Sequence, residues 1–223
     1  MNFFIKKMVI KFKGLFPVKF KTFLKRLRNF NGYQGLDRRM LEFINYENGF
    51  YIECGANDGV NQSNTWYFEK KLGWNGILIE PVATVFKELK KNRSKKNFFF
   101  QKAIRPKKFK KKIDLNVNFN DTLTTRSSID NTNRKKIKVE ATSLDYILKK
   151  VKAPKKIDFF SLDVEGDEFL VLKSINFKKY SFKFILIECN QLLKLKNLLK
   201  KYNYKFVKKM SSGNDYLFTS LKT

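Results

Sequence analysis

The stretch FYIECGANDG (50–59) decides the fold of this chain, because a short apolar run ends there in a turn that carries two glycines. The run 50–54 has the continuous apolar character of a strand that is buried on both faces. A helix-compatible stretch over 63–72 follows, and then a second strand-like run, GILIE (76–80). This alternation predicts a parallel sheet with helices on both faces.

The same alternation continues to the end of the sequence. Apolar runs and apolar residues at helical spacing predict further strands at 97–104, 157–164 and 183–189, and helices at 82–89, 167–175 and 191–201. The last two runs, 204–208 and 215–219, predict a hairpin joined by a turn through 211–213. A chain of 223 residues is long enough for one such α/β domain.

The composition excludes several kinds of catalytic site. The chain has no histidine, which rules out a Ser-His-Asp triad, a zinc site of the HExxH type and any imidazole acid or base. Its chemistry must therefore use carboxylates, lysine, tyrosine, backbone dipoles or a cofactor.

The net charge of +28 identifies no partner by itself. Lysine outnumbers arginine 40 to 8, whereas planar recognition of phosphate favours arginine. We therefore favour a compositional origin of the charge over a surface selected for nucleic acid, and we expect no specific nucleic-acid partner.

Residues 1–36 are predicted to be a separate basic extension, with nine Lys or Arg before Asp37 and no acid. Its apolar runs never exceed four residues, so we expect neither a membrane span nor a signal-peptide core. Aromatic and aliphatic residues alternate with lysines over 1–30, which suits an amphipathic segment on an anionic membrane face. A solvated extension whose aromatics pack on the domain fits equally well. We expect a cytoplasmic protein, with peripheral contact at the inner membrane face as the open alternative.

Acidic residues gather where the predicted strands end. Eight of the 20 acids lie there, namely Glu53, Asp58, Glu80, Asp163, Glu165, Asp167, Glu168 and Glu188. The carboxyl ends of parallel strands form the ligand-binding edge of such sheets. Helix N-termini explain Asp167 and Glu168, but they explain poorly the acids that close strands.

The turn 55–59 and Glu80 together indicate a cofactor of the adenosine type. Gly55 permits a tight turn, Asn57 tolerates a left-handed conformation, and Glu80 is placed to accept hydrogen bonds from ribose hydroxyls. The turn lacks the GxGxxG pattern, and a pyrophosphate would be repelled by Glu53 and Asp58. The sulfonium and amino groups of S-adenosylmethionine suit such acids. No GxxxxGK[ST] motif is present.

Three segments resemble the FkbM-type methyltransferases, a branch of the class I S-adenosylmethionine-dependent enzymes. They are YIECGANDGVNQSNTWYFEKKLGWNGILIEP (51–81), IDFFSLDVEGDEFLVL (157–172) and FILIECN (184–190). The resemblance implies a Rossmann-like, mostly parallel seven-stranded sheet of order 3-2-1-4-5-7-6 with a C-terminal antiparallel hairpin, formed by residues 37–223 with a polar loop insertion at about 104–156.

The resemblance also implies the site. Glu53, Gly55, Asn57 and Gly59 would border the methionine part of the cofactor, with Ala56 in the same turn. Glu80, followed by Pro81, would hold the ribose. Asp163 and Glu165 would face the transferred methyl group.

Cys54 and Cys189 each close a predicted strand. In the expected order, strand 4 separates their strands, so two steps of ~4.8 Å place them beyond the ~7 Å reach of a disulfide. We expect two reduced core cysteines.

Transfer of a methyl group to an alcohol requires removal of a proton. Without histidine, Asp163 is our first choice as base, with Glu165 and Glu188 nearby. The alternative is that these three carboxylates hold Mg²⁺ or Ca²⁺, which would lower the pKa of the acceptor.

We expect O-methylation of a saccharide or another small hydroxylated acceptor within glycan biosynthesis. A nucleic-acid methyltransferase or nucleic-acid-binding protein is the alternative that the basic surface suggests, and a non-catalytic module tethered by residues 1–30 is a third. The polar stretch 119–134 is expected either to contact the acceptor or to be a surface loop.

Overall fold

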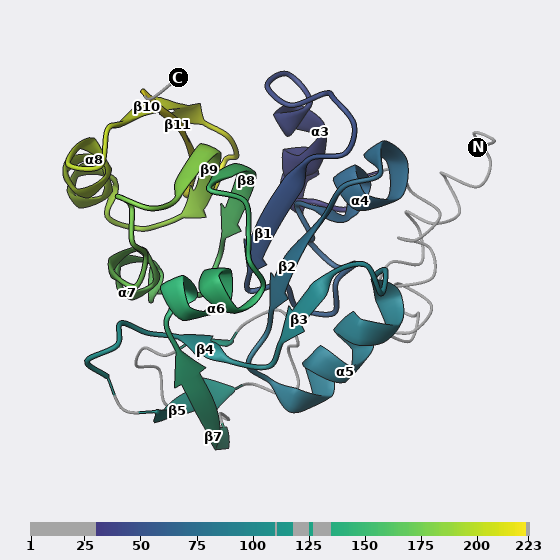
Figure 1. Ribbon diagram of the computed structural model, residues 1–223, viewed down its shortest axis with the longest axis vertical. Helices are drawn as coiled ribbons and strands as arrows, with labels where there is room; N and C mark the ends of the chain where they lie inside the picture. Colours follow the sequence, from purple (N-terminus) through teal and green to yellow (C-terminus); the bar gives the residue numbers. More distant parts are fainter. Residues whose placement is uncertain (1–29, 110, 118–124, 127–134, 222–223) are drawn as a thin grey trace.

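The computed structural model describes residues 30–109, 111–117, 125–126 and 135–221 (Figure 1). The expected basic extension lies outside these residues except for 30–36. Leu36 and Asn31 are already buried, so packing against the domain begins before residue 37. Among the described residues, no helix has both the length and the apolar character needed to span a membrane.

The main sheet has seven strands in the order that the sequence predicts. They are β1 (Phe50–Cys54), β2 (Asn75–Ile79), β3 (Phe98–Phe100), β8 (Lys156–Leu162), β9 (Ser181–Glu188), β10 (Tyr204–Lys209) and β11 (Asp215–Ser220). Their spatial order is β10-β11-β9-β8-β1-β2-β3, which is 3-2-1-4-5-7-6 when these strands are counted along the chain. β11 is antiparallel to both β9 and β10, and the remaining neighbours are parallel. The Rossmann-like α/β fold is confirmed.

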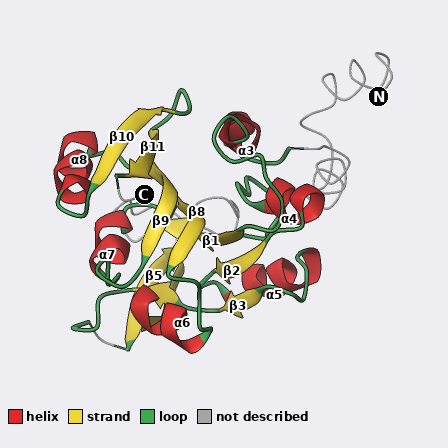
Figure 2. Cartoon of the chain, turned by 45° about the horizontal axis from the view of Figure 1, so that its top comes forward, coloured by secondary structure: helices red, strands yellow, loops and turns green. Residues whose placement is uncertain are grey.

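Helices cover both faces of this sheet, as Figure 2 shows. One face carries α6 (Leu144–Lys150), α7 (Glu168–Lys173) and α8 (Leu192–Lys200), and the other carries the turn η1 (Tyr33–Gly35), α3 (Leu36–Met40), α4 (Trp66–Leu72) and α5 (Ala83–Asn92). Each face has its own apolar core. The two cores use alternate strand residues, with Ile52 and Phe160 facing one side and Tyr51 and Phe159 the other.

The expected single strand over 97–104 is wrong. The segment divides into β3 and β4 (Ala103–Ile104), and the two strands join different sheets. Ala103 is buried in a third apolar cluster with Val82 and Leu115, which draws β4 away from the main sheet.

A second sheet replaces much of the polar loop expected over 104–156. Its order is β4-β7-β5-β6, with β5 (Lys112–Val117), β6 (Thr125–Arg126) and β7 (Lys135–Thr142). β5 and β7 are antiparallel and correspond to two strand-like pieces of sequence, at 113–117 and 138–142. The same connection also contains α6. Most of the polar stretch 119–134 lies outside the described residues.

Both cysteines are free and buried, and β8 lies between their strands, as expected.

The close approach of β1 and β8 at Gly55 and Asp163 can be tested by substitution of glycine. Gly55 has φ +80°, and a Cβ added there would lie 1.7 Å from the Asp163 carbonyl oxygen. Gly35 has φ +75° but open space around it, with its nearest neighbour, Arg38 Cβ, at 4.0 Å. We expect Gly35→Ala to cost about 1 kcal/mol from backbone strain. Gly55→Ala adds a backbone clash and is expected to cost at least about 3 kcal/mol in urea unfolding. Equal costs would contradict this packing.

Candidate functional site

The carboxyl ends of β1, β2, β8 and β9 converge on one edge of the main sheet, and the second sheet covers part of it. Between the two sheets lies a cavity of about 50 Å³. It is lined by Cys54, Gly55, Ile79, Glu80, Pro81, Lys102, Ala103, Ile104, Arg105, Leu115, Asp163, Val164, Asp167 and Val171. Four of the predicted site residues, Gly55, Glu80, Pro81 and Asp163, therefore meet at one cavity.

Glu80 is a buried acid at this cavity, with 4% of its surface exposed. Its carboxylate accepts the backbone N–H groups of Asn57 at 3.2 Å and Val82 at 2.9 Å. The pKa of Glu80 is raised to about 7, mainly by burial. The charge of Asp58 adds to this rise, and the two backbone donors oppose it. The protein thus holds an acid in a place where its ionised form is costly, which is typical of functional sites.

The turn after β1 has the backbone that its sequence predicts. Asn57 has φ +47°, in the left-handed region. Asp58 Oδ1 accepts the N–H groups of Val60 and Asn61, at 2.9 and 2.7 Å. The N–H groups of Gly55 and Ala56 both donate to the Ile79 carbonyl, so the turn is fixed to the end of β2.

Glu53 is surrounded by donors from the protein. Ser63 Oγ lies 3.0 Å and Thr65 Oγ1 2.6 Å from Glu53 Oε2, and the Asn64 N–H donates to Glu53 Oε1 at 2.8 Å. The segment Ser63–Thr65 has a clear structural role here, which is to anchor this carboxylate. Glu53 was expected to border the methionine part of the cofactor, and its observed contacts are those of a residue that holds the turn.

Arg93, a functional residue that the sequence analysis missed, completes this network. Its guanidinium is buried and donates from Nε to Glu69 at 2.7 Å and from Nη1 to Glu53 at 3.3 Å and to the Gly59 carbonyl at 3.2 Å. It also donates to Tyr51 Oη at 2.8 Å. Burial alone would raise the pKa of Glu69, but the charge of Arg93 and the hydrogen bonds from Lys70, Arg93 and the Ser94 N–H together lower that pKa to about 2. A lone arginine in the lysine-rich stretch KKNRSKK (90–96) was the available signal.

The second acidic group of the site lies at the ends of β8 and β9. Asp163, Glu165 and Glu188 each offer a carboxylate oxygen, and these atoms lie within 4.8 Å of one another. Burial, followed by the charges of Glu188 and Glu165, holds the pKa of Asp163 well above its usual range. Burial, followed by Glu165 and Asp215, also raises the pKa of Glu188. Both carboxyls are therefore easier to protonate than an exposed acid.

Two further observations complete this cluster. Asp163 Oδ1 is buried and has no hydrogen-bond partner among the described residues. Asp215, which the sequence analysis did not single out, begins β11 directly opposite Glu188. Sequence spacing does not show this pairing, because the two residues come from antiparallel strands.

Comparison with known protein families shows which family this chain belongs to. The family described as Methyltransferase FkbM domain matches residues 53–206, which is more than half of the chain. The chain belongs to the FkbM methyltransferase family. The resemblance found in the sequence is confirmed.

Similar solved structures include two methyltransferases. The methyltransferase FkbM of Methylobacillus flagellatus has 16% identity and a TM-score of 0.48, over 78% of this chain and 43% of that one. A methyltransferase from Geobacter sulfurreducens has 10% identity and a TM-score of 0.49, over 97% and 96% of the two chains. This chain thus spans less than half of the Methylobacillus protein. No curated protein sequence matches it significantly.

The residues at the cavity fit the adenosine part of the cofactor of this methyltransferase. The lining is mainly apolar, and Glu80 is its buried hydrogen-bond acceptor. Pockets for ligands of this size measure roughly 300–1,000 Å³, so the cavity as it stands is smaller than such a ligand. An ion pair between Arg105 and Asp167, which both line the cavity, joins the residue after β4 to the segment before α7.

The network around Arg93 can be tested by stability. Arg93→Met removes the ion pairs of Arg93 with the buried carboxylates Glu53 and Glu69, leaves Glu69 only its ion pair with Lys70, and is expected to cost about 3–5 kcal/mol. Arg93→Lys is also expected to be destabilising, because an ammonium lacks the planar fork that reaches several acceptors. The exposed Arg38→Met is the control, with an expected change within about 0.5 kcal/mol. Chemical denaturation measures all three, and a small effect at Arg93 would contradict the network.

Proposed function

We propose that this methyltransferase transfers a methyl group to a hydroxyl of a saccharide or another small hydroxylated acceptor. The observation that carries the proposal is the cluster of half-buried carboxylates Asp163, Glu165 and Glu188 at the sheet edge, next to the cavity of Glu80. The pKa values of Asp163 and Glu188 are both raised there. An alcohol must lose a proton when it is methylated. A carboxylate with a raised pKa is a stronger base than an exposed one.

The cofactor is proposed to lie between the main-sheet edge and the second sheet. S-adenosylmethionine supplies an electrophilic methyl group on its sulfonium. Glu80 is proposed to accept hydrogen bonds from the ribose hydroxyls, and Pro81, Ile104 and Leu115 to contact the adenine. The turn that contains Gly55, Ala56, Asn57 and Gly59 is proposed to contact the methionine part. Glu53 holds this turn in place.

Asp163 and Glu188 are proposed to remove the acceptor's proton. We infer that this pair holds one proton and one negative charge between its two carboxyls, so one member is available as a base. The unpartnered Oδ1 of Asp163 is suited to accept a hydrogen bond from the acceptor hydroxyl. Holding the two reactants in line is expected to supply much of the remaining rate.

A divalent cation is the alternative means of activating the acceptor. Asp163, Glu165 and Glu188 offer the hard oxygen ligands that Mg²⁺ or Ca²⁺ prefers. A cation would replace the shared proton and lower the pKa of a bound hydroxyl.

We propose that the protein is cytoplasmic, where two free buried cysteines would stay reduced. Peripheral membrane contact through residues 1–30 is part of the same proposal, and those residues lie outside the described part except for Phe30.

Proton release on binding tests the role of Glu80. With a pKa of about 7, Glu80 is mostly protonated at pH 6 and mostly ionised at pH 8. If the cofactor binds to the protein with Glu80 ionised, binding should release up to roughly 0.9 proton per molecule at pH 6 and close to none at pH 8. Titration calorimetry with S-adenosylhomocysteine in buffers of different ionisation enthalpy measures this release. Glu80→Gln should bind at least about tenfold more weakly and lose the release.

The exposed Glu42→Gln is the matched control and should behave as the wild type. If Glu80→Gln binds with unchanged affinity and unchanged proton release, Glu80 does not hold the cofactor.

Turnover tests the shared-proton pair. Asp163→Asn is expected to lower the rate at saturating cofactor by about 10²–10⁴-fold, because it removes the base. The exposed Asp114→Asn should leave the rate unchanged. Since the pKa of Asp163 is raised, wild-type activity should fall on acidification at a higher pH than an ordinary carboxylate would give.

Adding EDTA or Mg²⁺ distinguishes the two routes. Loss of activity in EDTA, restored by Mg²⁺ and abolished by Glu165→Gln, would favour the cation. Full activity of Asp163→Asn would exclude both roles for this residue.

A further inference from the structure

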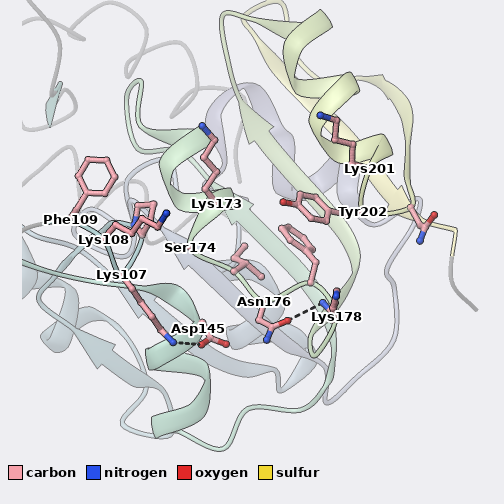
Figure 3. A pocket seen from close by; sticks show the side chains of 14 residues that line it. Lys107, Lys108, Phe109, Asp145, Lys173, Ser174, Asn176, Lys178, Lys201 and Tyr202 are labelled. Atoms are coloured by element: carbon pink, nitrogen blue, oxygen red, sulfur yellow. Dashed lines mark hydrogen bonds and ion pairs between the residues drawn. The ribbon is translucent and has the colours of Figure 1, made fainter.

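A larger hollow of about 850 Å³ lies on the face of the sheet that α6, α7 and α8 cover (Figure 3). It shares no lining residue with the cofactor cavity. We call it the basic groove. Its walls are the segment 106–109, the start of α6, the residues after α7 and the residues after α8.

The basic groove has a strong excess of positive charge. Five lysines line it, namely Lys107, Lys108, Lys173, Lys178 and Lys201, against the single acid Asp145. Asp145 is already paired with Lys107 at 3.4 Å and with Lys149 at 3.3 Å. The other four lining lysines make no ion pair with any described residue. In Figure 3 these lysines stand on different sides of the hollow, so their charges surround whatever occupies it.

Aromatic and amide groups lie between these lysines. The rings of Phe177 and Tyr202 stack with centroids 4.2 Å apart. Phe109, 49% exposed, stands on the opposite wall. Asn176 and Asn203 add amides that can bond to hydroxyls. The basic groove thus combines cations, hydroxyl partners and ring surfaces.

This combination favours an acidic saccharide over a nucleic acid. The groove has no arginine, the residue whose planar fork suits phosphodiesters best. Phe177 is buried and stacked on Tyr202, so this pair offers at most one free ring face, whereas single-strand binding uses a series of aromatic faces for successive bases. Sugar rings need only an aromatic edge or face and amide partners.

We propose that the basic groove binds an acidic saccharide, with its lysines holding carboxylate or phosphate groups and with Phe109 and Tyr202 contacting the sugar rings. This inference deepens the proposed function, because it gives the acceptor an acidic glycan portion outside the transfer site. Binding to the groove itself does not depend on methyl transfer.

The test measures binding by the full chain without cofactor. The probes are a short oligogalacturonate, a phosphorylated oligosaccharide of the same length, a neutral oligosaccharide and a single-stranded oligonucleotide of equal charge. Lys173→Gln, Lys178→Gln and Lys201→Gln are combined in one variant. The matched control combines Lys87→Gln, Lys95→Gln and Lys205→Gln, which are equally exposed lysines outside the groove and remove the same charge.

The groove variant should bind the acidic saccharides about tenfold more weakly, and the control variant less than about threefold. Phe109→Ala should also weaken binding but leave its salt dependence unchanged, since it removes no charge. The neutral saccharide should not bind.

If the two triple variants lose equal affinity for the acidic saccharides, the binding comes from the general basic surface and not from the groove. That result would overturn the proposal. Tighter, groove-dependent binding of the oligonucleotide would overturn it in favour of nucleic acid. Cofactor binding and turnover are measured separately, so a failed groove and a failed transfer site give different results.

Discussion

The site depends on one buried cation. The guanidinium of Arg93 ties Glu53, at the end of β1, to Glu69 in α4 and to the Gly59 carbonyl in the turn between them. A buried charge of this kind is tolerated only when it is paired and hydrogen-bonded on all sides. Because these partners come from three separate segments, the network fixes the path of the chain from residue 53 to residue 69, and with it the turn that we propose faces the cofactor.

The acids at the sheet edge consequently have two different roles. Glu53 and Glu69 are satisfied by Arg93 and serve the fold, and the pKa of Glu69 is lowered to about 2. Glu80 and Asp163 make no ion pair with any described residue, and burial raises the pKa of each. Acids that are kept at a cost in stability are the ones expected to meet a ligand. Acids are scarce in this basic chain, so their concentration at the sheet edge indicates a site. Their partners then distinguish the acids that stabilise the fold from the acids expected to bind a ligand.

The sequence predicted those parts of the structure that rest on local patterns. Strands β1 and β8 and the C-terminal hairpin follow from short apolar runs, and Glu80 follows from its distance to the turn 55–59. The second sheet was missed as a unit because β4 pairs with β7 across more than thirty residues, and no local signal specifies that pairing. Arg93 and Asp215 were missed for the same reason, since their partners are distant in sequence.

We propose that the edge between the two sheets holds the cofactor through Glu80. A crystal structure of the protein with S-adenosylhomocysteine tests this placement. We expect ribose hydroxyls within hydrogen-bond distance of the Glu80 carboxylate, adenine against Ile104 and Leu115, and a second sheet that has moved outward. A cofactor bound elsewhere, with Glu80 still closed against Asn57 and Val82, would contradict it.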